Sequence, residues 1–281
     1  MKLHNLIKIS MLVAFAAASF SLGAAEANWR ERASAEEEMT TGDVDAEVAF
    51  GREISARILG RYKAYNDPEL IKYVNLVGLS LARSTNRPEL EYHFMILDTN
   101  TVNAYAAPGG YVFVTEGALR LMKDESELAG VLAHEIGHVT EMHVVKELKI
   151  KGVDDSITTG LAQLVGGSSE SARAAFAQAV DKGFEMIFTD GYKREDEMQA
   201  DKTAAMICGL GGYDATGLAR YLDRIRPIKE KTPDPDQTHP TINSRISQIN
   251  EAIAANGIDT GSAANNQKRF AAATKALKES R

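Results

Sequence analysis

The sequence predicts a mostly helical α+β domain with a small β-sheet beside one central helix. Apolar residues recur at helical spacing over residues 48–84, and four further helical segments are expected after residue 124. Between these regions, residues 90–97, 103–107 and 111–115 are short and rich in apolar and aromatic residues, which is typical of β-strands. The sequence contains no internal repeat, which argues against a solenoid arm.

The first 27 residues have the features of a secretory signal peptide. Lys2 and Lys8 precede an uncharged apolar run that ends near residue 22, and small residues follow it. Cleavage is expected after Ala25 or Ala27, with Ala27 slightly favoured. An uncleaved anchor is the weaker alternative, because the run is shorter than the ~20 residues that span a bilayer. Export and a single cysteine, Cys208, which cannot form an internal disulfide, favour a bacterial periplasm.

Composition and charge restrict the class of partner. The chain has 281 residues, of which 44% are hydrophobic and 25% charged, an ordinary globular composition. Loss of residues 1–27 removes two of 32 basic and one of 39 acidic residues, which leaves 30 and 38 and a net charge of −8. This acidic balance argues against nucleic acid or an anionic membrane surface as the main partner. We expect no transmembrane segment after the leader is cleaved.

The remaining residues divide into a lead-in, one domain and a tail. Residues 28–47 are polar and acidic, and we expect a mobile or helical lead-in there. The domain is expected over residues 48–255. Within it, residues 151–185 contain Gly-rich and Ser-rich breaks and are interpreted as a mobile excursion. The polar residues 256–281 are expected to form a peripheral C-terminal tail.

A metal-binding motif lies on the helix that is predicted to begin near Asp124, which forms a capping box with Glu127. His134, Glu135 and His138 make the pattern His-Glu-x-x-His, in which residues four apart share one helix face, so both imidazoles can bind one ion. Zinc lowers the pKa of a bound water, and Glu135 is placed to take its proton. The alternative is a helix with two ordinary histidines, which is disfavoured in a stretch that should be buried.

A catalytic zinc needs a third protein ligand, and spacing excludes one source of it. Metzincins require a glycine and then a histidine at the positions where this chain has Glu141 and Val144. His143 lies five residues beyond His138, about 500° around the helix, and is therefore expected to be a surface residue.

A carboxylate from a second helix is the remaining source. Glu197 and Asp201 stand four residues apart, so one can bind zinc while the other hydrogen-bonds a ligand imidazole. The neighbouring residues are also charged, so a solvated helix face would produce the same pattern. The residues alone leave this choice open.

Several motifs occur together in one order, and this order resembles the gluzincin metallopeptidases of the HtpX, BepA and CAAX prenyl protease superfamily. The matching segments are Asn103-Ala-Tyr-Ala106, Pro108-Gly-Gly110, Glu197-Met-Gln-Ala200-Asp201, Gly212-Tyr-Asp214, His239-Pro240 and Arg245-Ile246. They extend over most of the chain that would remain after leader cleavage. The resemblance implies a zincin-like metallopeptidase domain with one Zn²⁺ per chain. The chain differs from the family members that span membranes or carry helical repeats, and it is similar to the compact periplasmic members.

The resemblance also assigns roles to individual residues. Glu197 is implied as the third zinc ligand, and Asp201 as the support of the His134 or His138 ring. The strand formed by Asn103, Ala104, Tyr105 and Ala106 is implied as the cleft edge, where an extended substrate can add its own strand.

Two more positions have open roles. His239 could approach the zinc and hold the enzyme latent, or donate a hydrogen bond to the oxyanion of the reaction. The alternative is a loop histidine that caps the next helix. Arg245 could pair with an acidic neighbour, or be a surface arginine.

The expected function is that of a zinc-dependent metalloendopeptidase acting on unfolded or misassembled envelope proteins, with envelope assembly factors as candidate partners. A rival interpretation is a zinc-stabilised periplasmic chaperone or assembly factor without proteolysis. Glu135 argues against this rival, because a structural zinc site needs no base. A closed fourth ligand at His239 would argue for it.

Overall fold

The computed structural model of the chain describes residues 41–148, 157–229, 240–261 and 263–280. Its elements are α2 (Thr41–Arg61), α3 (Pro68–Ala82), β1 (His93–Leu97), β2 (Ala104–Ala107), β3 (Tyr111–Thr115), α4 (Glu116–Leu121), α5 (Glu125–Thr140), α6 (His143–Glu147), α7 (Ile157–Gly166), α8 (Glu170–Glu185), the π-helical turn η1 (Met186–Asp190), α9 (Arg194–Leu210), α10 (Gly217–Lys229), α11 (Ile242–Ala255), α12 (Gln267–Ala273) and α13 (Lys275–Glu279). The predicted leader with its cleavage positions, and His239, lie outside the described residues.

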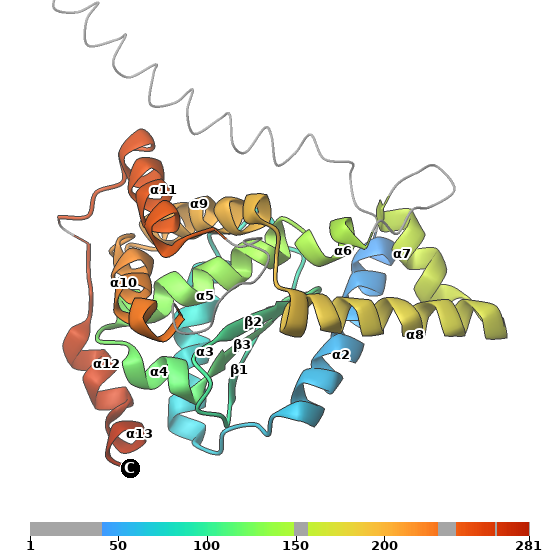
Figure 1. The fold of residues 1–281 in the computed structure, drawn as a ribbon, viewed down its shortest axis with the longest axis horizontal. Helices are drawn as coiled ribbons and strands as arrows, with labels where there is room; N and C mark the ends of the chain where they lie inside the picture. The colour runs from blue at the N-terminus through green and yellow to red at the C-terminus, as the bar shows by residue number, and fades with distance from the viewer. Residues whose placement is uncertain (1–40, 149–156, 230–239, 262, 281) are drawn as a thin grey trace, which may run out of the picture. The chain divides into compact units, whose positions relative to one another are not determined.

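The three predicted strands form one small sheet beside α5 (Figure 1). The strand order is β1-β3-β2, with β1 parallel and β2 antiparallel to β3. Gly109 and Gly110 form the turn between β2 and β3 with φ of 74° and 94°, which glycine adopts without steric cost. Within the described sheet, β2 is therefore an edge strand, and the mostly helical α+β class is confirmed.

Helix α5 is the centre of the fold. All of its residues are buried, since it packs against the sheet, α3, α9 and α10 (Figure 1). Its first turn is fixed by Asp124, whose side chain accepts a hydrogen bond from the Glu127 amide at 2.9 Å, as the capping pattern predicted. A fully buried helix that contains histidine and glutamate must pair these groups internally, which places its polar residues in contact with neighbouring elements.

Helices α5 and α9 approach each other closely where their small residues meet. A Cβ atom added to Gly137 would lie 3.1 Å from both Cα and the carbonyl oxygen of Ala200. Larger side chains at these two positions would separate the helices. The small residues thus bring the histidine-bearing face of α5 directly against the acidic face of α9.

Residues 151–185 were interpreted as a mobile excursion, and the part of them that the structure describes is helical. Residues 157–166 and 170–185 form α7 and α8, which pack on α2 and on each other. The Gly-rich break is short and lies between the two helices, which are both formed. Ser169 caps α8 by accepting a hydrogen bond from the Ala172 amide at 3.1 Å.

Helix α2 begins within the segment that was expected to be a lead-in. It starts at Thr41, and Glu47 within it is fully buried. The Glu47 carboxylate accepts a hydrogen bond from the Gly109 amide at 3.0 Å and pairs with Arg87 at 2.8 Å. An acidic residue here therefore supports the turn between β2 and β3.

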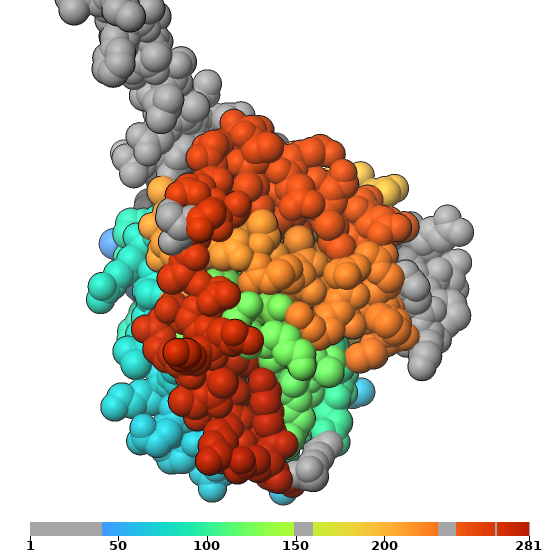
Figure 2. Space-filling view, turned by 90° about the vertical axis from the view of Figure 1, so that its left-hand side faces the viewer, coloured from blue at the N-terminus to red at the C-terminus, as the bar shows by residue number. Residues whose placement is uncertain are grey.

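The C-terminal residues 256–281 were expected to form a peripheral tail, and the structure shows two helices there, each with a buried apolar residue. Phe270 of α12 and Leu277 of α13 have no exposed surface. Figure 2 shows this segment in red against the green and cyan surface, and α12 packs on α3 and α5 while α13 packs on α4. These two buried apolar residues dock the helices together with polar contacts, such as the ion pair between Arg269 and Glu125 of α5. No helix among the described residues is long and apolar enough to cross a membrane.

Candidate active site

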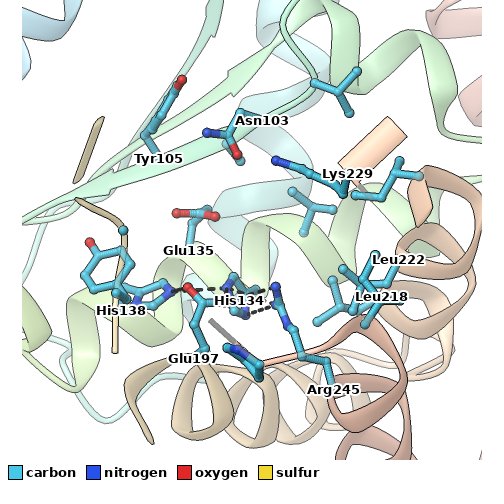
Figure 3. A pocket seen from close by; sticks show the side chains of 18 of the residues that line it. Asn103, Tyr105, His134, Glu135, His138, Glu197, Leu218, Leu222, Lys229 and Arg245 are labelled. Carbon is cyan, nitrogen blue, oxygen red and sulfur yellow. Dashed lines mark hydrogen bonds and ion pairs between the residues drawn. The ribbon is translucent and has the colours of Figure 1, made fainter. Parts of the chain in front are cut away.

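The two histidines of the motif face Glu197 across the contact between α5 and α9 (Figure 3). The Nε2 atoms of His134 and His138 are 3.1 Å apart, and each lies 3.6 Å from an oxygen of Glu197. One donor atom from each residue lies within 4.8 Å of the others. Two imidazole nitrogens and one carboxylate oxygen are a common donor set of catalytic zinc sites, so this group fits a zinc ion.

Glu135 lies beside this group, and its side chain points into the same cleft (Figure 3). The residue is 6% exposed. Burial raises the pKa of its carboxyl group to about 7, because the charged form is poorly solvated and Glu197 is a nearby like charge, although His134 opposes the shift. A carboxyl group that titrates near neutral pH can both accept and return a proton.

Asp201 and Arg245 form a buried ion pair behind His134. The Asp201 carboxylate accepts hydrogen bonds from Arg245 Nε at 2.8 Å and Nη2 at 2.7 Å. The same carboxylate lies 2.9 Å from Nδ1 of His134. Arg245 also reaches Glu197, with Nη1 3.0 Å from an oxygen of that residue. The expected pairing of Arg245 is therefore present, and Asp201 orients the His134 ring with Nε2 toward the donor group.

The prediction that His143 is a surface residue is wrong. It is 3% exposed, and its Nδ1 lies 2.9 Å from Nδ1 of His138. The helical extrapolation failed because α5 ends at Thr140 and Met142 adopts a left-handed φ of 55°, so His143 does not continue the helix that carries His138. His143 therefore contacts the Nδ1 atom of His138, while the Nε2 atom of His138 faces His134 and Glu197.

A cleft of about 690 Å³ opens above the donor group. Its walls come from the start of β2, η1, α10 and the start of α11, and include Asn103, Ala104, Tyr105 and Lys229 (Figure 3). The expectation that Ala106 is also at the cleft edge is wrong, because this residue is 1% exposed and does not line the cleft.

Comparison with known proteins also indicates a metallopeptidase. Residues 68–253 match the profile of peptidase family M48. The chain belongs to this family. The predicted family resemblance is thus confirmed, and the M48 match includes α5, α9 and every described element that lines the cleft.

Individual relatives of this M48 chain carry related names. It is 30% identical over 220 residues to the beta-barrel assembly-enhancing protease of Yersinia pestis, covering 74% of the chain and 44% of that protein. It is 24% identical over 217 residues to the metalloprotease YcaL of Escherichia coli (strain K12), covering 77% of the chain and 83% of that protein. The chain spans less than half the length of the assembly-enhancing proteases that it matches.

Two residues of the M48 cleft were missed by the sequence analysis. The Tyr192 ring stacks on the His138 ring, with centroids 3.7 Å apart and planes 16° apart. Lys229 extends from the end of α10 toward Asn103 and the cleft (Figure 3). No local signal distinguishes either residue, since a tyrosine before a helix and a lysine at a helix end are common on any protein surface.

Proposed function

We propose that this M48 chain is a zinc-dependent endopeptidase, with His134, His138 and Glu197 as the metal ligands. The observation that carries the proposal is the convergence of these three donors beside the buried carboxyl group of Glu135, at the floor of an open cleft. A structural zinc site would have four protein ligands and no need of a base. The site has a base and a cleft, which are the parts that hydrolysis of a bound chain requires.

When bound, zinc would supply a Lewis acid for the scissile carbonyl group and lower the pKa of water toward neutrality. Glu135 accepts the proton of the attacking water at a carboxylate oxygen and delivers it to the nitrogen of the leaving amine. A pKa near 7 suits both transfers, since neither protonation state is strongly favoured. Asp201 holds the Nδ1 proton of His134, which keeps Nε2 free to act as a ligand.

The substrates we propose are unfolded or misassembled envelope proteins in a bacterial periplasm. The support comes from the expected leader, from the names of the assembly-enhancing relatives, and from the position of the cleft beside an edge strand. An edge strand binds an extended chain through backbone groups, which makes few demands on sequence and suits unfolded proteins. His239 remains a candidate either for a latent fourth contact or for an oxyanion donor.

Cleavage of casein by residues 28–281 tests the proposal. Wild type should cut in a chelator-sensitive way, and Glu135→Gln should lose at least about 100-fold in rate while keeping zinc, since it lacks only the proton acceptor. Glu195→Gln, an exposed acid on α9, is the matched control and should keep full rate. Higher activity of His239→Ala would indicate latency. Stoichiometric zinc with no cutting by wild type or His239→Ala would favour the binding-protein interpretation instead.

A further inference from the structure

The backbone of β2 has two differently placed sets of hydrogen-bonding groups. In an antiparallel pair, alternate residues direct both groups toward the partner strand, and the residues between them direct both groups outward. The Thr115 amide donates to the Asn103 carbonyl at 3.1 Å, so Asn103 faces β3. Ala104 and Ala106 follow in the opposite set, and their amide and carbonyl groups therefore point to the outer edge of the sheet.

These two outward positions are not equally accessible. Ala104 is partly exposed and lines the cleft, so its groups are available to a ligand. Ala106 is 1% exposed, and its carbonyl oxygen accepts a hydrogen bond from the Tyr192 hydroxyl at 3.3 Å. The outer edge of β2 is thus open at one residue and closed two residues further along.

The Tyr192 side chain is held in this place from both ends. Its ring stacks on His138 at a centroid distance of 3.7 Å, and its hydroxyl group binds the Ala106 carbonyl. The residue is 7% exposed, so little freedom remains for the ring to move aside. One side chain therefore connects a candidate metal ligand with the edge strand.

We propose that Tyr192 closes the outer edge of β2 beyond Ala104, so that a bound peptide pairs with this strand at a single residue. Closure restricts where on the edge the peptide backbone can pair, because the Ala106 carbonyl is already occupied and only Ala104 remains open on this strand. Tyr192 thus acts as a specificity-determining residue for backbone position rather than for side chains. The inference rests on the proposed function only in taking the cleft as the place where a peptide binds.

Peptide binding to the zinc-loaded Glu135→Gln protein tests this proposal without turnover. The probe is a fluorescein-labelled ten-residue casein peptide, the tightest binder among overlapping casein peptides, and fluorescence anisotropy measures its Kd. Backbone N–H groups are replaced one at a time by ester oxygens. Loss of the N–H that pairs with the Ala104 carbonyl should weaken binding about threefold to tenfold. The N–H groups two residues to either side should change Kd by less than about twofold.

Two substitutions at Tyr192 in the same background identify the cause. Tyr192→Phe keeps the ring over Ala106, so the pattern of a single sensitive N–H should persist. Tyr192→Ala exposes the Ala106 carbonyl, and a second sensitive N–H should appear two residues from the first. Zinc content is measured on both proteins, because the ring also contacts His138.

The measurement with Tyr192 intact can refute the proposal even if the Tyr192→Ala protein does not fold. Two sensitive N–H groups spaced by two residues with Tyr192 intact would overturn it, as would an unchanged pattern in a folded Tyr192→Ala protein. Failure of every casein peptide to bind would overturn it too. Casein cleavage without any sensitive N–H would reject this inference and leave the peptidase proposal standing. A single sensitive N–H in a protein whose wild type does not cleave casein would support this inference and reject the peptidase proposal.

Discussion

Asp201→Asn is the substitution whose effect can be worked out most fully from the structure. Asp201 has no exposed surface and accepts three contacts, two from Arg245 at 2.7 and 2.8 Å and one from His134 at 2.9 Å. An amide places an NH₂ group where one carboxylate oxygen was, so at least one donor then faces another donor. The loss of one charge-assisted hydrogen bond and of the buried charge should cost about 3 kcal/mol of unfolding free energy.

The same change should weaken zinc binding. Because Asp201 orients the His134 ring, we expect a loss of about 10-fold to 100-fold in zinc affinity. Urea unfolding of the zinc-free protein and competition with a chelator measure the two effects separately. Glu195→Gln on the same helix is the control, and should change stability by less than about 0.5 kcal/mol. The reasoning is refuted if Asp201→Asn behaves like this control in both assays.

Acidification gives an independent check on Asp201. Burial alone would raise the pKa of its carboxyl group, but the charge and hydrogen bonds of Arg245 outweigh burial and lower the pKa from 3.8 to about 2. A lowered folded-state pKa contributes stability that is complete above the unfolded value and is lost as pH falls through the folded value. The stability difference between wild type and Asp201→Asn should therefore be constant above pH of about 4 and shrink toward pH 2.

Two further substitutions test the packing around the site. Gly137→Ala should be neutral or destabilising in urea unfolding and should lower zinc affinity, because the added Cβ would meet the backbone of Ala200. Gly60→Ala is the comparison, because the Cβ added there would have no atom within 4 Å, and it should stabilise its helix by about 0.5–1 kcal/mol. Equal effects of the two changes would contradict the close helix contact. Phe270→Ala should cost about 3–5 kcal/mol if α12 belongs to the core, and removal of residues 263–281 should cost at least as much. A loss below 1 kcal/mol in either protein would contradict the docked tail.

Some errors in the sequence interpretation have a common physical cause. Periodicity reports which face of an element is apolar, but not what covers that face. The polar stretch after residue 256 buries Phe270 and Leu277 and pairs Arg269 with Glu125 of α5, and the Gly-rich segment near residue 167 is a short break between two helices. The buried position of His143 depends on the end of α5 at Thr140 and on Met142, a single left-handed residue that no pattern in the sequence indicated.

The sequence by itself determined what depends on local geometry. His134 and His138 share a helix face because they are four residues apart, Asp124 caps the helix because its side chain reaches the Glu127 amide, and the three strands follow from short apolar runs. The family could also be identified from the order of its motifs.

Only the tertiary structure decided which groups meet across elements. Spacing alone does not distinguish Glu197 from Asp201, although the family resemblance does, and their different contacts arise from the place where α9 crosses α5 at Gly137. The closure of β2 by Tyr192 depends likewise on a loop that arrives from more than eighty residues away in the chain. Such contacts are set by the packing of distant segments, and local spacing carries no information about them.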